Sequence, residues 1–164
     1  MKVIGVDPGL SGAVAILIDG EVAEAFDAPT FTLLRNGKQR RFLDEAAFFG
    51  LLKVHADAAL ALIEDVHAMP KQGVSSSFSF GFVTGQMGMA LTAAGIPKDK
   101  ISPQYWKKYL RVPAEKDGAR AAASRLMPRA AHMWPLKKHD GRAEAALLAY
   151  FAWEKINGRI SSSI

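Results

Sequence analysis

The sequence predicts an α/β protein in which a mixed five-stranded sheet carries helices on both faces. Three observations lead to this prediction. Short β-rich runs joined by tight-turn signals open the chain, so three antiparallel strands come first. A continuous apolar run, ALALIEDV, follows at residues 59–66 and is typical of a buried central parallel strand. Helical periodicity then dominates the remaining chain, with one further short strand around Ile101.

The first three strands are expected at Val3–Val6, Ala13–Ile18 and Glu21–Phe26. The segment DPGLSG between the first two has the proline and glycine content of a turn. Asp19-Gly20 is a hairpin signal between the second and third strands.

A further hairpin is predicted in TFTLLRNGKQRRF, with Asn36-Gly37 as its tight turn. Its second arm carries Lys38, Arg40 and Arg41. Such a basic arm is compatible either with a solvated surface ribbon or with a DNA-contacting one, and we carry Arg40 and Arg41 forward as candidate DNA contacts.

The helical segments have recognisable starts and ends. Asp44 is a candidate N-cap for a helix that continues to about His55. Further helices are expected at Ser77–Ala94, at 104–110, at Glu115–Leu126 and at Asp140–Lys155. Neither an internal repeat nor a linker interrupts this order, so residues 1–157 are interpreted as one domain and residues 158–164 as a frayed tail.

Composition narrows the class of protein. The chain has 164 residues, 49% of them hydrophobic, which favours a globular domain with a real core. It contains no cysteine, no apolar run long enough for a membrane span and no signal-peptide pattern, which fits a cytoplasmic protein. The formal net charge of +5 and the pI of about 9.6 favour a polyanionic partner, above all nucleic acid.

Four carboxylates stand at positions where functional groups gather. Asp7 ends the first strand and Glu64 ends the fourth, so both emerge at one sheet edge if these strands are parallel neighbours. Asp140 and Glu144 are four residues apart and share one face of the last helix. Together they form a ring of hard oxygen ligands that suits Mg²⁺ or Mn²⁺, and two such ions suit phosphodiester hydrolysis.

Each helix acid also has a purely structural interpretation. Asp140 is well placed to cap the helix, and Glu144 to interact with the helix dipole. The combination of all four acids, rather than any one of them, favours the metal site.

Four segments together resemble the RuvC family of Holliday junction resolvases, particularly its phage-encoded branch, within the ribonuclease H-like superfamily. They are IGVDPGLSGAVAI, ALIEDVHAMP, ISPQYWKK and KKHDGRAEAALLA, and the resemblance spans roughly Met1 to Trp153. It implies a ribonuclease H-like fold and metal-dependent cleavage of four-way or related branched DNA by a symmetric homodimer. It also implies a crossover junction endodeoxyribonuclease of a bacteriophage, acting in the host cytoplasm with neither a membrane nor a small-molecule cofactor.

The resemblance also implies catalytic roles. Asp7 would be the central ligand of a two-ion Mg²⁺ site in which Mn²⁺ substitutes, Glu64 would face it, and Asp140 with Glu144 would complete it. Cellular members commonly carry an acid-x-x-acid pair on this helix, whereas three residues separate the two acids here. His139 is therefore a further candidate ligand, and which two of these three bind metal stays open.

Candidate DNA contacts follow from the same resemblance. Lys107 and Lys116 match basic positions near the active site, and Lys108 follows Lys107 directly. His67 stands where the family often has an aromatic wedge that enters the junction core, and an imidazole stacks on a base less strongly than a phenyl ring.

The predicted Ser77–Ala94 helix is unusually rich in glycine. Gly81, Gly85 and Gly88 each cost about 1 kcal/mol of helix propensity relative to alanine, so close approach by another element is expected. Two interpretations stay open: tight packing on the protein's own sheet, and pairing with the same helix of a second copy, as the resemblance implies.

Three rival functions share parts of this pattern. An actin-like ATPase needs two such domains and a second phosphate loop, which 164 residues do not provide. A catalytically inactive junction binder conflicts with the four acids. A ribonuclease H-type hybrid nuclease shares the metal chemistry without needing the glycine-rich helix.

Overall fold

The computed structural model describes residues 1–67 and 73–158. Its strands are β1 (Lys2–Asp7), β2 (Ala13–Ile18), β3 (Glu21–Asp27), β4 (Thr30–Arg35), β5 (Lys38–Leu43), β6 (Leu60–Glu64) and β7 (Lys98–Ile101). Its α-helices are α1 (Glu45–Lys53), α2 (Val74–Ala93), α3 (Pro103–Tyr109), α4 (Gly118–Leu126) and α5 (Asp140–Ile156). Two 3-10 helices, η1 (Pro128–Met133) and η2 (Lys137–His139), precede α5. None of the helices in the described ranges is long and apolar enough to span a bilayer.

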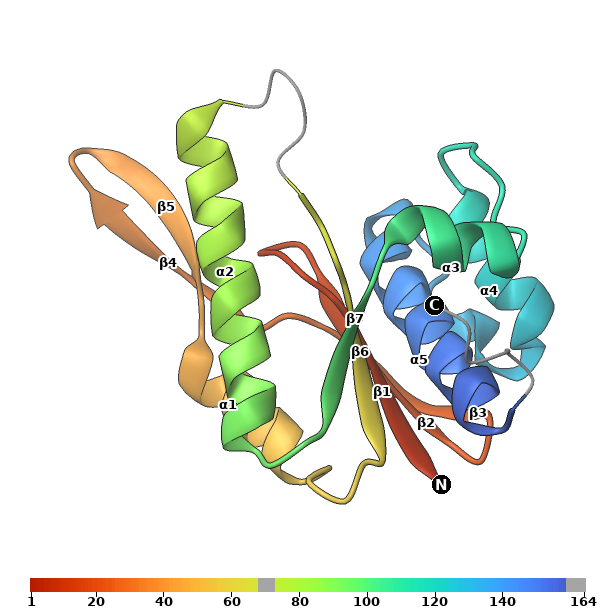
Figure 1. Ribbon diagram of the computed structural model, residues 1–164. Coiled ribbons are helices and arrows are strands. Elements are labelled where there is room, and N and C mark those ends of the chain that lie inside the picture. The colour runs from red at the N-terminus through yellow and green to blue at the C-terminus, as the bar shows by residue number, and fades with distance from the viewer. Residues whose placement is uncertain (68–72, 159–164) are drawn as a thin grey trace.

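Five strands form a mixed sheet in the order β3-β2-β1-β6-β7 (Figure 1). β2 is antiparallel to both β1 and β3, whereas β6 is parallel to both β1 and β7. The predicted fold class is therefore confirmed, including the change from antiparallel to parallel pairing after the third strand.

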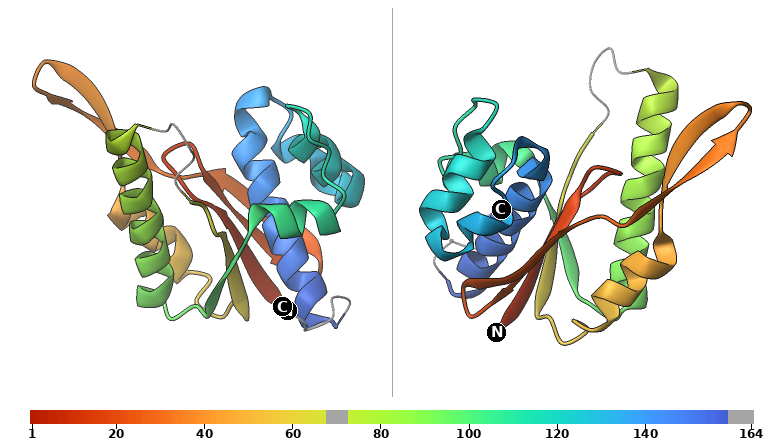
Figure 2. Two further views of the ribbon diagram at one scale, coloured as in Figure 1. Left: turned by 45° about the horizontal axis from the view of Figure 1, so that its top comes forward. Right: turned by 180° about the vertical axis from the view of Figure 1, so that it is seen from behind.

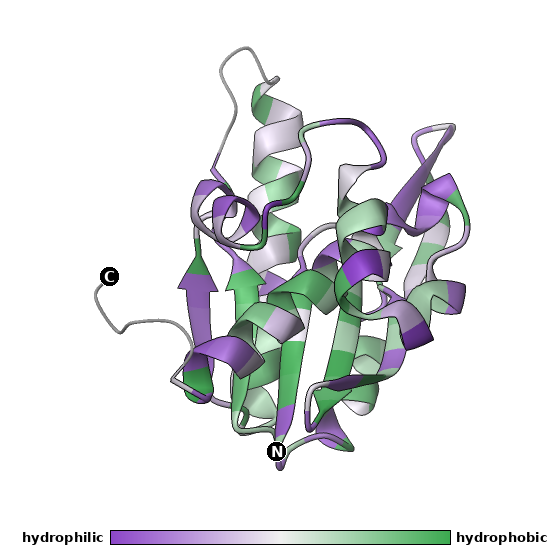
Figure 3. Ribbon diagram, turned by 90° about the vertical axis from the view of Figure 1, so that its right-hand side faces the viewer, coloured by the Kyte–Doolittle hydropathy of each residue, from purple (hydrophilic) through white to green (hydrophobic). Residues whose placement is uncertain are grey.

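Alternate residues of the central strands build two separate cores, one on each face of the sheet. On one face, Val3 and Leu62 pack with Leu147 and Phe151 of α5. On the other face, Ile4 and Ile16 pack with residues of α1 and α2. Figure 2 shows these helices on opposite sides of the sheet, and Figure 3 shows hydrophobic residues along most of the central strands. Burial on both faces explains why the sixth strand is apolar from Leu60 to Ile63, before it ends in Glu64.

The backbone of α5 lies directly against β1. A Cβ atom on Gly5 would come within 1.9 Å of the carbonyl oxygen of Ala145, so only glycine permits this approach. The close contact fixes the position of α5 along the strand that ends in Asp7.

Strands β4 and β5 form a separate two-stranded hairpin. Asn36 and Gly37 at its tip have φ angles of +50° and +70°, as a tight hairpin turn requires. Figures 1 and 2 show this hairpin projecting from the body of the protein beside α2.

Local predictions agree with the structure apart from a few boundaries. The side chain of Asp44 accepts a hydrogen bond from the Ala47 amide (3.0 Å), which confirms the predicted cap. Helix α2 begins at Val74, three residues before the predicted start, and α4 begins at Gly118 rather than Glu115. The segment between α4 and α5, for which no helix was predicted, contains η1 and η2. Residues 159–164 of the predicted tail lie outside the described residues.

Candidate metal centre at the sheet edge

Asp7 and Glu64 occupy neighbouring positions at the carboxyl edge of the sheet. β1 and β6 are adjacent and parallel, and Val6 pairs with Ile63 immediately before the two acids. Their backbones therefore bring both carboxylates to one edge, which is what the sequence predicted on the condition that these strands are parallel neighbours. Glu64 is only 7% exposed.

Glu144 joins these acids from the first turns of α5. Carboxylate oxygens of Asp7, Glu64 and Glu144 all lie within 4.8 Å of one another, so these three residues form an acidic cluster. The cluster depends on close packing at Gly141, where a Cβ atom would come within 2.9 Å of Asp7 Oδ2. Three hard oxygen donors at this spacing fit a divalent cation.

Burial and repulsion by neighbouring carboxylates make Asp7 and Glu64 difficult to ionise. Burial raises the pKa of Asp7 well above its usual range, and the charges of Glu144 and Glu64 raise it further. Burial likewise raises the pKa of Glu64, with a further contribution from Glu144. A bound cation would relieve this cost, because it compensates the buried negative charge.

Lys107 on α3 is the cation nearest to the cluster in the described residues. Its Nζ lies 2.7 Å from Glu144 Oε1 and 3.9 Å from Glu64 Oε1. Burial lowers the pKa of Lys107, but the hydrogen bond to Glu144 and the surrounding carboxylates outweigh burial and raise it overall. The side chain is 37% exposed, so a charged ammonium group stands at the rim of the cluster.

Trp106 supports the cluster from inside the core. Its indole N–H donates a hydrogen bond of 3.0 Å to Glu64 Oε1, and the residue is fully buried. This hydrogen bond opposes the increase in the Glu64 pKa. Sequence reasoning singled out Lys107 and passed over Trp106. Trp106 could have been identified because it lies on the apolar side of a short amphipathic helix. A buried indole N–H needs a hydrogen-bond acceptor, and an acid at a strand end can provide one.

Asp140 and His139 lie beside the acidic cluster without belonging to it. Arg120 donates a hydrogen bond of 2.6 Å from Nε to Asp140 Oδ1. His139 is buried, and its Nδ1 lies 3.4 Å from the Leu136 amide. Burial and nearby cations, chiefly Arg142, lower the pKa of His139.

Two of the predicted basic residues, Lys116 and Arg40, line cavities beside the candidate metal centre. Lys116 lines a cavity of about 220 Å³ together with Lys107, Asp140 and Glu144. Arg40 lines a second cavity, of about 600 Å³, that reaches Asp7.

The other predicted DNA contacts stand outside the cluster. Lys108 is exposed on α3. His67 is exposed after β6, with Nε2 3.6 Å from Asp65 Oδ2. Arg41 donates a hydrogen bond of 2.6 Å to Ser11 Oγ in the turn that follows Asp7.

The sheet order, the parallel β1–β6 pair and the helices on both faces define a ribonuclease H-like fold of the RuvC type. No protein-family model and no curated protein sequence matches the chain. Among solved structures, RuvC of T. thermophilus in complex with a Holliday junction substrate aligns with a TM-score of 0.61 and 15% identity, over 96% of this chain and 97% of that chain.

Two further structures have the same fold. A Thermus thermophilus RuvC structure aligns with a TM-score of 0.58 and 18% identity, over 94% of this chain and 97% of that chain. The fowlpox virus Holliday junction resolvase aligns with a TM-score of 0.55 and 13% identity, over 96% of this chain and 99% of that chain. The similarity to RuvC-like resolvases indicated by the sequence motifs is thus confirmed at the level of the fold.

Proposed function

We propose that this protein is a metal-dependent endonuclease that cuts four-way and related branched DNA by paired, symmetric nicks. The observation that carries the proposal is the convergence of Asp7, Glu64 and Glu144, from three separate elements, with Lys107 at their rim. The fold supports it, because the aligned structures include a RuvC in complex with a junction and a poxvirus resolvase. The sequence resemblance extends the proposal to a phage protein acting in the host cytoplasm.

The acidic cluster fits Mg²⁺, with Mn²⁺ as a substitute, because all three donors are carboxylates. Two ions held there would activate a water molecule and stabilise the leaving oxygen. Asp7, Glu64 and Glu144 are the proposed ligands. Asp140 remains a candidate fourth ligand, for which its carboxylate would have to leave Arg120, and His139 remains the alternative.

The basic residues have a separate role in the proposal. Lys107 and Lys116 would bind phosphate oxygens of the scissile strand, since both line one cavity with Glu144. Lys108 and His67 would contact DNA further out, with His67 stacking on a base at the junction. These contacts hold and orient the strand over the acidic cluster.

Paired nicking requires two sites, and α2 offers a surface for a homodimer. Phe78, Phe82 and Met89 on this helix are 75%, 59% and 63% exposed. A Cβ atom added to Gly81 or Gly85 would have no atom of another described element within 4 Å, so these glycines do not serve packing within the described part of the chain. An apolar helix face with open glycines fits close approach by a second α2 across a two-fold axis.

The test of the proposed activity is cleavage of a labelled four-way junction, compared with linear duplex and RNA–DNA hybrid of the same sequence. We expect the wild type to cut opposed junction strands in Mg²⁺ or Mn²⁺ but not in EDTA. The Asp7→Asn variant should bind without cutting. The control Asp57→Asn should keep full activity, because Asp57 is exposed and pairs with Lys2 at the other end of β1. Preference for the hybrid, or binding without cleavage by the wild type, would contradict the proposal.

The ligands on α5 can be identified separately. Glu144→Gln, Asp140→Asn and His139→Ala should be compared for cleavage in Mg²⁺ and in Mn²⁺ and for Mn²⁺ binding by calorimetry. Loss of Mn²⁺ binding marks a ligand, whereas lost cleavage with Mn²⁺ binding intact marks a group that acts on the DNA.

A further inference from the structure

The β4–β5 hairpin carries a strong positive charge. Residues 30–43 contain Arg35, Lys38, Arg40 and Arg41 and no acidic residue. The hairpin alone therefore has a formal charge of +4. A cationic surface without acidic residues is typical of one that meets a polyanion.

The base of the hairpin is attached to the candidate metal centre. Arg41 is hydrogen-bonded to Ser11 in the turn after Asp7, and Arg40 lines the cavity that reaches Asp7. From there the two strands run outward beside α2 (Figures 1 and 2). Each strand has six residues, which corresponds to a length of about 20 Å, or roughly six base pairs of duplex DNA.

The hairpin is exposed on both faces over most of its length. Residues 31–41 are all exposed, and Leu34 near the tip is 73% exposed. On one face the rings of Phe31 and Phe42 stack at 5.8 Å, and the Arg35 guanidinium lies 5.1 Å from the Phe42 ring centre. These ring contacts hold the cationic arm together, and a two-stranded ribbon of this kind fits a DNA groove or backbone.

We propose that the β4–β5 hairpin is a second DNA-contact element, which follows the phosphate backbone of a duplex arm leaving the metal centre. The inference rests on the proposed function, because it takes branched DNA as the substrate. The hairpin contributes affinity and orients the arm, whereas the acidic cluster performs the chemistry. The DNA contact runs from Arg40 and Arg41 at the base of the hairpin to Arg35 and Lys38 at its cationic tip.

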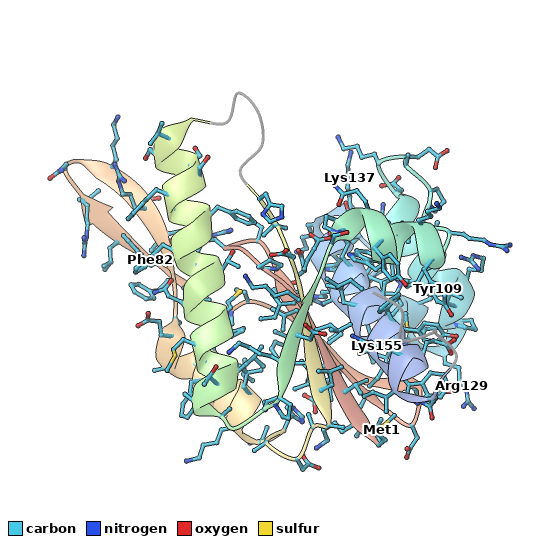
Figure 4. All side chains as sticks on the ribbon, viewed as in Figure 1. Met1, Phe82, Tyr109, Arg129, Lys137 and Lys155 are labelled. Carbon is cyan, nitrogen blue, oxygen red and sulfur yellow. The ribbon has the colours of Figure 1, made fainter. Side chains whose placement is uncertain are left out.

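For the cationic surface of the hairpin, as distinct from the apolar face of α2, a second protein copy is the less favourable occupant. Figure 4 shows Phe82 on the hairpin side of α2, where it lines a groove with Phe42 and Phe78. Helix α2 contains no charged residue, so the α2 of a partner copy would provide no counter-charge for the hairpin. DNA supplies that counter-charge at every phosphate.

The inference is tested by junction binding as a function of salt concentration. In the double variant Arg35→Gln/Lys38→Gln, we expect a log–log salt slope shallower by about two and an affinity lower by on the order of 10- to 60-fold at about 0.1 M salt. The matched control, Lys53→Gln/Arg129→Gln, also removes two charges. Lys53 lies on α1 and Arg129 on the side of the molecule away from the hairpin (Figure 4), so this control should leave the slope unchanged.

A second readout locates the contact on the DNA. Uncharged methylphosphonates placed within about six base pairs of the nick on one arm should weaken binding by the wild type, but weaken it less for the hairpin variant. Circular dichroism must show the variant folded. If the double variant is not folded, the single variant Lys38→Gln should still reduce the log–log salt slope of junction binding by about one.

The outcomes separate the two proposals. If the wild type binds no junction, the proposed function fails. If the wild type binds and cuts but the folded hairpin variant keeps its affinity and slope, only the hairpin inference is wrong. If the variant instead dissociates into monomers during sedimentation, the hairpin belongs to a protein interface and the inference is overturned.

Discussion

Helix α5 is buried against one face of the sheet, whereas α2 covers the other face and remains largely exposed. Along α5, nine residues are buried, and Gly5 of β1 admits its backbone to direct contact. Along α2, which is three residues longer, only Val83, Met87 and Leu91 are buried. Both helices are rich in small residues, so composition alone does not explain the difference.

The two helices differ in burial because α5 positions a carboxylate of the acidic cluster and α2 does not. Glu144 must hold its carboxylate beside Asp7 and Glu64, and a buried helix fixed at Gly5 and Gly141 provides that position. No residue of α2 belongs to the acidic cluster, and its exposed aromatic face is available to another molecule. Changes on the α5 side should therefore affect chemistry, and changes on the α2 side should affect assembly.

The largest effect is expected from Asp7→Asn. Cleavage should fall by about 10³-fold or more, because the substitution removes the central charge of the acidic cluster. Junction affinity should be unchanged or higher, since no phosphate contact is lost. A gel-based cleavage assay with a parallel binding titration measures both, and substantial Mg²⁺-dependent cleavage by this variant would refute the site.

The same variant should be more stable than the metal-free wild type at neutral pH. The pKa of Asp7 is higher in the folded than in the unfolded protein, so the ionised carboxylate opposes folding. This cost disappears as the pH falls through the raised pKa and the group becomes protonated. Thermal unfolding in EDTA should therefore show a Tm advantage of a few degrees for Asp7→Asn near pH 7, which shrinks towards acid pH.

Gly141→Ala tests the packing of α5 against the acidic cluster without changing any charge. An added methyl group would lie 2.9 Å from Asp7 Oδ2 and displace it, so cleavage should fall by up to about 10²-fold. The control Gly50→Ala adds the same group on α1, where no other described element comes within 4 Å. That control should gain roughly 0.5–1 kcal/mol of stability and keep its activity. Equal activity in the two variants would show that the close approach of α5 is unimportant.

Gly85→Leu tests the exposed face of α2 as a dimer interface. A bulky side chain in the centre of the exposed α2 face should separate two paired helices and raise the dimer dissociation constant by on the order of 10- to 100-fold. Sedimentation measures the mass, after circular dichroism has shown the variant folded, and Gly50→Leu is the matched control. On a cruciform plasmid, the folded monomer should give nicked circles where the wild type gives linear product. A wild type that is monomeric with junction bound would contradict both the dimer and the resolvase assignment.

Trp106→Phe should have the smallest effect, a loss of several-fold to about 10-fold in cleavage. The substitution removes the N–H that holds Glu64, and so should raise the pKa of Glu64 and move the acid limb of the pH–rate profile to higher pH. The control is Trp134→Phe, which breaks a similar 2.9 Å bond to Ser124 Oγ away from the centre. Only Trp106→Phe should shift the profile, and an equal shift in both would contradict a positioning role.

Much of the fold was predictable because it depends on local patterns. The β-rich runs of β1 and β2, the apolar run of β6 and the Asp44 cap each reflect short-range chemistry, and each agrees with the structure. The start of α2 at Val74 was not predictable, because the serines in its first turn carry no helical periodicity.

What the sequence determined by itself was the set of strand ends and helix starts on which the acids stand. Parallel neighbouring strands end at one edge, so the sequence predicts that Asp7 and Glu64 meet once their strands pair, and the parallel pairing of β1 with β6 fulfils that condition. Tertiary structure alone decided which helix acid joins them. Glu144 faces the cluster and Asp140 pairs with Arg120 because packing at Gly5 and Gly141 sets the rotation of α5. The same holds for the Trp106–Glu64 bond and for the hairpin beside α2, since both join segments whose approach depends on the whole core.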